Sequence, residues 1–216
     1  MVLLFSVCAG YGLAGDVPEE QARVNSRVFG VLPNYRTADG TKPFAPISSK
    51  MKLRIAAKDS FDFPMYFLAG FYASLGQLEN ENSSLGQGLA GFGRRYVRGF
   101  GDVVIGNFLT EGLLPSVLHE DPRYFRIGPG GGSKMHRTLY ALTRILVTRT
   151  DAGGRRFNFS EILGNAAGVG IANAYYPDTR NLHDNVSRFG VQVGTDAASN
   201  VMKEFWPDIR QKMFHR

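Results

Sequence analysis

Cysteine is nearly absent from this chain of 216 residues, which contains only Cys8. Cys8 lies in an apolar N-terminal run that we expect to be removed, and the remaining chain then has no thiol. Disulfide bonds, a cysteine nucleophile and cysteine metal ligands are therefore excluded from the mature protein. A lipidated cysteine is an alternative, although Val7 is a poor neighbour for it and the preceding run is short. We expect packing alone to stabilise the fold.

Motifs that bind metals or nucleotides are also lacking. The four histidines, His119, His136, His183 and His215, include no i, i+4 pair, so the sequence predicts no metal site. Residues 128–134 read GPGGGSK and resemble a phosphate-binding loop, but the Gly-Lys-Ser/Thr ending is missing. The chain has no GxSxG sequence and no dinucleotide-binding fingerprint after a strand. We therefore expect no cofactor.

Long blocks of like charge are missing, although 25 Lys and Arg outnumber 19 Asp and Glu. The densest basic group is Arg94, Arg95 and Arg98, and a second is Arg155 with Arg156. Groups this small suit anionic lipid head groups or nucleic acid about equally, and a solvated face is the competing interpretation. We expect no nucleic-acid partner. Arg94, Arg95 and Arg98 stay candidate binding residues, with membrane lipid or another envelope protein as the partner.

After the N-terminal segment, the sequence contains no apolar run long enough to cross a bilayer. Residues 63–78 are uncharged but short, and residues 162–176 supply about fifteen uncharged residues where about 20 are needed. The glycine-rich stretch between them contains Asp102 and Glu111, which would be costly in hydrocarbon. A conventional multi-span membrane protein is not expected. A protein partly sunk in a membrane, or a bundle with a polar interior, stays open.

The N-terminus reads MVLLFSVCAGYGLAGD and turns polar after Ala14. This is typical of a signal peptide, and Gly12-Leu13-Ala14 supplies the small-x-small residues that a signal peptidase requires. We expect residues 1–14 to be an export signal, which places the protein in the periplasm or the outer-envelope membrane of a bacterium. No Lys or Arg precedes the apolar run, so we expect the natural start to lie upstream of Met1.

The remaining chain predicts an all-α fold. Residues 15–47 hold several prolines and no sustained period, which indicates an extended arm or linker. Residues 48–216 predict a single-domain bundle of about five to six glycine-rich helices, of which the last bends at Pro207 and is anchored there by Trp206. The expected helices cover 50–61 after a serine cap, 64–78, 85–114 with a break, 133–150, 158–176 and 182–206. The fourth is expected to bury one stripe, formed by Met135, Leu139, Leu142 and Leu146.

Small residues recur every fourth position in the last two expected helices. Each glycine in a helix interior costs about 0.5 to 1 kcal/mol relative to alanine. Close approach of two backbones would offset this cost through dispersion contacts. We therefore expect helix packing, or the interface of a homo-oligomer, along two stripes: Gly164, Gly168 and Ala172, and Gly190, Gly194 and Ala198.

The segment LLPSVLHEDPRYFR collects groups that could carry chemistry. His119, Glu120 and Asp121 are the candidate acid and base residues, and Arg123 and Tyr124 are candidate ligand-binding residues. A structural interpretation competes with both. One short helix would end at His119, and Asp121 followed by a proline would cap the next turn.

Several motifs resemble a family of exported bacterial proteins that carries no assigned activity. They are DPRYFR, FNFSEILGN, NAYYP and EFWPDIR, and the similarity covers nearly all of the chain after the signal. The resemblance implies export. It implies no catalytic residue.

Three function hypotheses follow. The first is an exported, envelope-associated helical protein with a non-catalytic structural or binding role. The second is a hydrolase-like enzyme centred on His119, Glu120 and Asp121. The third is a helical membrane pore or lipid-handling protein whose small-residue stripes line an oligomer interface.

Overall fold

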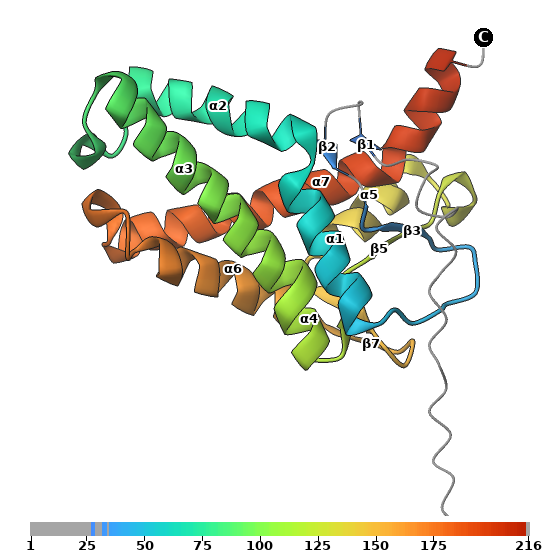
Figure 1. The fold of residues 1–216 in the computed structure, drawn as a ribbon. Coiled ribbons are helices and arrows are strands. Elements are labelled where there is room, and N and C mark those ends of the chain that lie inside the picture. Colours follow the sequence, from blue (N-terminus) through green and yellow to red (C-terminus); the bar gives the residue numbers. More distant parts are fainter. Residues whose placement is uncertain (1–26, 29–31, 34, 215–216) are drawn as a thin grey trace, which may run out of the picture.

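The computed structural model describes residues 27–28, 32–33 and 35–214 and shows a mostly helical protein (Figure 1). The expected signal peptide and Cys8 lie outside the described residues. The helices are α1 (Ser49–Phe61), α2 (Phe63–Leu78), α3 (Gly88–Asn107), α4 (Leu114–Val117), α5 (Lys134–Thr143), α6 (Phe159–Ala172) and α7 (Leu182–Phe214). Four short helical segments join them: η2 (Ser83–Leu85), the π-helix η3 (Phe108–Leu113), η4 (Pro129–Gly131) and η5 (Pro177–Thr179).

Short strands make the all-α expectation wrong in detail. They are β1 (Arg27–Val28), β2 (Leu32–Pro33), β3 (Thr37–Asp39), β4 (Glu120–Asp121), β5 (Tyr124–Arg126), β6 (Val147–Thr150) and β7 (Arg155–Phe157). β1 pairs with β2, β3 pairs with β5 in parallel, and β4, β6 and β7 form an antiparallel sheet. None exceeds four residues, so none carries an alternating pattern long enough to be read from the sequence.

The starts of three expected helices are confirmed by their side-chain caps. The Ser48 hydroxyl accepts a hydrogen bond from the amide of Met51 at 3.3 Å and begins α1. Asn158 accepts from the amide of Glu161 at 3.2 Å and begins α6. Ser133 does the same for α5. These oxygens satisfy amides that have no partner inside the helix.

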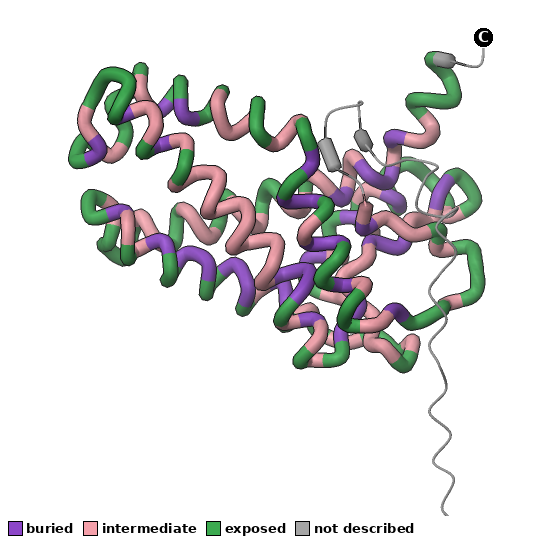
Figure 2. The backbone as a smooth tube through the Cα atoms, in the orientation of Figure 1, coloured by how far each residue is buried: buried purple, intermediate pink, exposed green. Residues whose placement is uncertain are grey.

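The elements form two ends (Figure 1). The four-helix end consists of α2, α3, α6 and the first half of α7. The sheet end holds α1, α4, α5, the strands and the second half of α7, whose last turns point away from its earlier axis in Figure 1. Pro207 lies inside α7, and Trp206 beside it is buried, as expected for an anchor. Figure 2 shows burial concentrated in the sheet end and along α6.

The stripe expected to bury α5 faces outward instead. Met135, Leu139, Leu142 and Leu146 are exposed, while the buried residues of α5 are Arg137 and Ala141. Arg137 is drawn inward because its guanidinium pairs with the buried Glu204 at 2.8 Å. The helix also ends at Thr143, and the chain continues into β6 instead of the expected helical turns.

The two small-residue stripes differ in how they pack, and the first lies partly against another element. A β-carbon on Gly164 would lie 2.6 Å from Thr110 Cγ2, so α6 and η3 pack closely there. Gly168 and Ala172 are buried, with open space beside Gly168.

The second stripe does not pack inside the chain, which corrects the expectation. Gly190, Gly194 and Ala198 on α7 are exposed, and open space surrounds both glycines. α7 instead turns a polar face toward α6, where Asn165 donates to Asp196 at 3.3 Å.

Charged side chains occupy much of the interior. The largest side chains that are less than 2 % exposed include Lys52, Glu120, Glu204 and Asp121. Apolar side chains are common on the surface, and α2 exposes Phe63, Phe67 and Phe71 among others. Among the described residues, none of the helices combines the length and the hydropathy that a bilayer crossing needs.

Candidate functional site

The structure separates the candidate acid and base residues. His119 adopts a φ of 54° and its side chain is 82 % exposed, with Nδ1 3.8 Å from an Asp151 oxygen. It lines neither of the two cavities described below. Glu120 and Asp121 point into the interior instead. His119 is therefore not placed to exchange a proton with a substrate held beside the two carboxylates.

Both carboxylates have structural partners. Glu120 Oε2 accepts from the amide and hydroxyl of Ser160 at 2.8 Å and 2.5 Å, so it caps the start of α6, and Arg156 pairs with Oε1 at 3.1 Å. Asp121 receives the guanidinium of Arg123 at 2.9 Å and 2.6 Å. These contacts favour the structural interpretation of the segment over a catalytic one.

Arg123 and Tyr124 are also engaged. Arg123 Nη2 donates to the Ala45 carbonyl at 2.6 Å, which fixes residues 35–47 to the sheet end. The Tyr124 hydroxyl donates to Glu204 Oε2 at 2.7 Å. Burial and this bond raise the pKa of Tyr124. These bonds engage the Tyr124 hydroxyl and the Nε and Nη2 atoms of Arg123.

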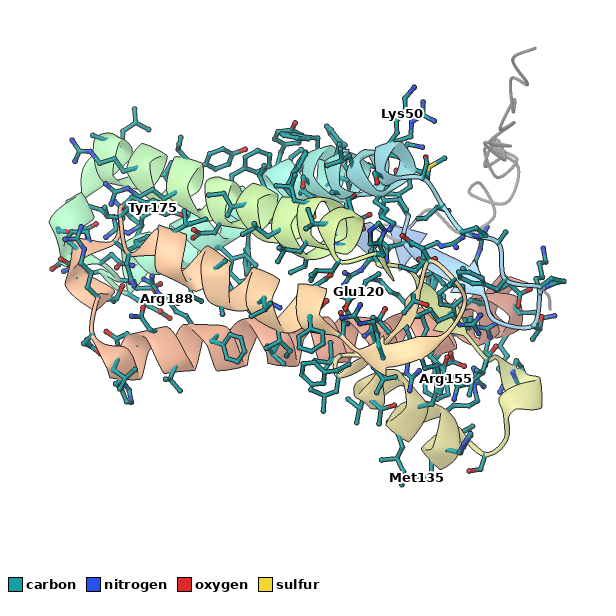
Figure 3. All side chains as sticks on the ribbon, turned by 90° about the horizontal axis from the view of Figure 1, so that it is seen from below. Lys50, Glu120, Met135, Arg155, Tyr175 and Arg188 are labelled. Atoms are coloured by element: carbon teal, nitrogen blue, oxygen red, sulfur yellow. The ribbon has the colours of Figure 1, made fainter. Side chains whose placement is uncertain are left out.

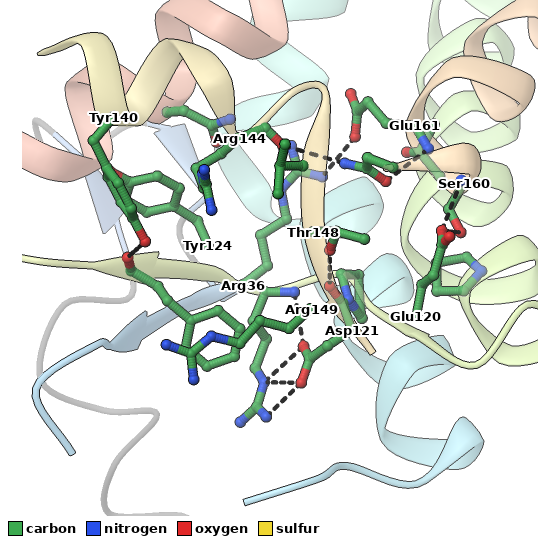
Figure 4. A pocket seen from close by; sticks show the side chains of 18 residues that line it. Arg36, Glu120, Asp121, Tyr124, Tyr140, Arg144, Thr148, Arg149, Ser160 and Glu161 are labelled. Atoms are coloured by element: carbon green, nitrogen blue, oxygen red, sulfur yellow. Dashed lines mark hydrogen bonds and ion pairs between the residues drawn. The ribbon is translucent and has the colours of Figure 1, made fainter. Parts of the chain in front are cut away.

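A small cavity of about 40 Å³ lies beside this segment (Figure 4). Its lining includes Glu120, Asp121, Tyr124 and Ser160, whose polar atoms bond to one another or to neighbouring groups. The volume suits one or two water molecules. It is too small for an organic substrate.

Arg94, Arg95 and Arg98 do not form one basic surface. Arg95 is buried and donates to the carbonyls of Glu81 and Gly86, and Arg94 donates to the Leu85 carbonyl. These two residues therefore clamp the loop between α2 and α3. Arg98 turns elsewhere, with its guanidinium 5.9 Å from the centre of the Tyr176 ring.

The sequence did not reveal a buried group of charges where the two ends of the molecule meet. We name it the charge cluster, and its members are Arg36, Asp59, Glu111, Glu161, Asp196 and Lys203. Arg36 Nη1 lies 3.2 Å from Glu111 and 4.0 Å from Glu161, and its Nη2 lies 3.8 Å from Asp196. Lys203 is buried beside them on α7.

Two pairs of carboxyl groups interact within the charge cluster. Asp59 acts on Glu111, and Glu161 acts on Asp196. Burial and mutual repulsion favour a proton on one member of each pair. We expect two such protons, which would leave two negative charges to balance Arg36 and Lys203.

The pKa shifts agree with this balance. Burial, with Asp196 adding repulsion, raises the pKa of Glu161 to about 8. Burial and the neighbouring Asp59 raise the pKa of Glu111 well above its ordinary value. Burial and Arg36 lower the pKa of Lys203 to about 8. Shifted groups of this kind occur at functional sites, but they also occur in structural ion networks.

The charge cluster predicts a pH-dependent stability. The raised pKa of Glu161 means that the folded protein holds a proton that the unfolded chain has released, between pH 4.5 and about 8. Stability must then fall as pH rises through this range. We expect Glu161→Gln to flatten the fall by on the order of 1 to 3 kcal/mol between pH 5 and pH 8, as measured by urea denaturation at each pH.

A surface replacement of the same kind serves as the control for this experiment. Glu79 is exposed at the end of α2, so Glu79→Gln is expected to keep the wild-type pH dependence. A wild-type slope in Glu161→Gln would contradict the proposed proton on the pair formed by Glu161 and Asp196.

A large cavity of about 510 Å³ lies in the four-helix end. Apolar residues form much of its wall. Its lining includes Met65, Leu68, Ala69, Val103, Val169, Ala172, Val191, Asp102, Tyr176, Arg188 and Gln192. We call the region around Asp102, Tyr176, Arg188 and Gln192 the polar part of the cavity. Figure 3 shows Tyr175 and Arg188 close together. The cavity could not be predicted from the sequence, because its wall comes from four helices separated along the chain.

The described residues contain no group of three or more His, Cys, Asp or Glu arranged to hold a metal ion. Comparison with known proteins gives no match, since no family model, curated protein or solved structure is significantly similar to the chain. The family resemblance of the motifs therefore stays a prediction.

Proposed function

We propose that the protein is an exported, envelope-associated binding protein that holds an amphiphilic molecule in the large cavity. The observation that carries this proposal is the cavity itself, about 510 Å³ between α2, α3, α6 and α7. Pockets for small molecules commonly enclose about 300 to 1,000 Å³ and combine apolar walls with a few polar groups. The large cavity meets both conditions.

The distribution of polarity along the wall supports an amphiphile over a fully polar ligand. Leu68 and Val103 represent the apolar part, which could cover a hydrocarbon chain. Asp102, Arg188 and Gln192 lie at the polar part and could bind a head group. A sugar or a nucleotide would leave many of its own polar groups against the apolar wall without partners.

The molecular surface supports association with the envelope. Phe63, Phe67 and Phe71 stand one turn apart on α2 and are 67 %, 66 % and 58 % exposed. Exposed apolar patches of this kind mark contacts with membranes or other proteins. Together with the N-terminal pattern of an export signal, they favour a position at a bacterial membrane.

Two of the candidate catalytic residues already bond to other groups of the protein, which favours a binding role over catalysis. Glu120 caps a helix and Asp121 holds Arg123, while His119 faces solvent. A general base must reach the proton that it removes from a substrate. The large cavity lies in the four-helix end, and no residue of this segment lines it.

Filling the cavity is expected to remove binding of an apolar molecule. Val103 lines the cavity, and a tryptophan there would occupy space that a ligand needs. We expect Val103→Trp to weaken binding of the neutral dye Nile red by about tenfold or more, a loss of ~1.4 kcal/mol or more. Fluorescence titration of the purified protein measures this change.

The matched control lies on the outer side of the same helix. Val97 is 68 % exposed on α3, so Val97→Trp adds the same side chain outside the cavity and is expected to leave the dye affinity unchanged. Thermal melting of both variants verifies that they fold. Equal dye binding by the wild type and both variants would show that the dye does not use the cavity, and the proposal would fail.

A further inference from the structure

Two guanidinium groups meet one tyrosine ring at the polar part of the large cavity. The guanidinium of Arg188 lies 4.4 Å from the centre of the Tyr176 ring, and that of Arg98 lies 5.9 Å from it. Tyr176 and Arg188 line the cavity, and Figure 3 shows Arg188 close to Tyr175. The structure therefore places Arg188 in the cavity lining and a second cation, Arg98, beside the same ring but outside the lining.

The nearby acidic groups do not satisfy these cations. Asp102 accepts hydrogen bonds from the hydroxyls of Tyr175 and Tyr176, the second at 2.8 Å. Burial also raises the pKa of Asp102, which favours its neutral form. Asp184 is the other carboxylate that acts on Arg188, from the exposed start of α7. Within the described part of the chain, neither Arg98 nor Arg188 has a carboxylate oxygen within ion-pair distance.

Each of the two guanidinium groups keeps one buried nitrogen without a hydrogen-bond partner. These atoms are Nη1 of Arg98 and Nη1 of Arg188, and the side-chain oxygen of Gln192 in the cavity wall is also unpartnered. A buried donor without a partner costs about 1 to 3 kcal/mol, and more when it is charged. Proteins rarely keep such groups unless a ligand or water completes them.

We infer that the large cavity takes an anionic amphiphile, whose carboxylate or phosphate oxygens accept a hydrogen bond from Nη1 of Arg188 in the cavity lining, while Arg98, which lies outside the lining, attracts the anion through its charge. The apolar chain of the ligand then lies along the wall that contains Leu68 and Val103. A charge-assisted bond of this kind is strong when it is shielded from water. This inference rests on the proposed function, since it assigns a head group to the ligand of the same cavity.

A cationic head group fits the same place poorly. The acidic residues in the lining are Asp102 and Glu81; the two tyrosine hydroxyls already occupy the oxygens of Asp102, and Glu81 is exposed on the loop after α2. A positive ligand would also approach Arg98 and Arg188, and repulsion in a region of low polarity is costly. The arrangement therefore discriminates between head groups by the sign of their charge.

The experiment compares head groups on one chain length. Dodecanoate, dodecyl phosphate, dodecanol and dodecyltrimethylammonium each compete with Nile red for the full-length purified protein, below their micelle-forming concentrations. The variants are Arg188→Met and Arg98→Met, which keep much of the apolar stem and remove the charge. Arg54→Met is the control, because Arg54 is exposed on α1 and does not line the cavity.

We expect dodecanoate or dodecyl phosphate to bind the wild type at least about tenfold more tightly than dodecanol, which corresponds to one charge-assisted hydrogen bond. The stronger of the two anions identifies the head group. Arg188→Met should lose this preference and Arg98→Met should reduce it while Nile red still binds, and Arg54→Met should keep it. Higher salt should weaken the anions and leave dodecanol unchanged.

The outcomes separate failure of this inference from failure of the proposed function. If all four compounds displace Nile red equally, or if the cationic compound binds best, the anionic head group is wrong although the cavity still binds apolar chains. Retention of the anion preference in both methionine variants also overturns the inference. If Nile red and all four compounds fail to bind, the proposed function itself is wrong.

Discussion

Glu204→Ala is expected to lower the free energy of unfolding by about 3 to 5 kcal/mol. Glu204 is completely buried, and its carboxylate accepts hydrogen bonds from the Tyr124 hydroxyl at 2.7 Å, the Gly128 amide at 2.9 Å and Arg137 Nε at 2.8 Å. Removing it leaves the charge of Arg137 buried without this partner. Breaking a buried ion pair in this way costs about 3 to 5 kcal/mol.

The expected loss is large because the side chain joins distant parts of the chain. It ties α7 to β5, to the loop after it and to α5. A loss of this size is a large share of the ~5 to 15 kcal/mol that separates folded from unfolded states in typical domains. Circular dichroism during urea denaturation measures it.

Two comparisons make the result specific to this carboxylate. Glu79 is exposed, so Glu79→Ala is expected to change stability by less than about 0.5 kcal/mol. Glu204→Gln keeps the shape and one acceptor oxygen, so it should be less damaging than alanine. A melting temperature of Glu204→Ala close to that of the wild type would show that the buried pair with Arg137 contributes little.

Gly164→Ala is the second change for which we expect a large effect. The added β-carbon would lie 2.6 Å from Thr110 Cγ2 and 3.2 Å from the Thr110 backbone nitrogen. α6 and η3 would have to separate, and overpacking of this kind costs about 1 to 3 kcal/mol. Thermal or urea denaturation gives the size of the change.

The same substitution on α7 should have the opposite sign. Gly190 lies in open space on an exposed helix face, so Gly190→Ala is expected to stabilise the protein by about 0.5 to 1 kcal/mol. Thr110→Ser removes Cγ2 and should restore part of the stability lost in Gly164→Ala. If both alanine variants change stability alike, the close contact between α6 and η3 is not present.

Local signals in the sequence were sufficient for the starts of helices. Helices begin next to Ser48, Ser133 and Asn158, where helix starts were expected, and the three side chains cap them, because a cap depends on residues within one turn. The break in the long third helix was also expected, and it takes the form of the π-helix η3. The strands were missed because their pairing partners are distant in the chain and each strand is very short.

The positions of apolar residues alone did not predict which face of a helix is buried. The stripe of α5 and the second glycine stripe both point outward, because buried ion pairs decide which face of each helix turns inward. Arg137 turns α5 toward Glu204, and Asp196 turns α7 toward the charge cluster. A pattern that counts apolar residues assumes an apolar interior, and this interior is rich in charge.

The binding site that we propose in the large cavity could not be predicted from the sequence, for a related reason. Residues 113–126 attracted attention because their functional groups are adjacent in sequence, yet those groups mostly bind one another and hold elements together. Arg98 and Arg188 are ninety positions apart on different helices. Their convergence on Tyr176 becomes visible only when the fold is known.

The ion pairs of Arg36 join segments that are far apart in the chain, so they form at different times during synthesis. Arg36 leaves the ribosome early, but Glu111, Glu161 and Asp196 emerge far later. The ion pairs around this guanidinium cannot all form until the first half of α7 has been made, and closure over such long separations is slow. An interior that is completed this late would keep the polypeptide unfolded for passage through a secretion channel, as the export that we propose requires.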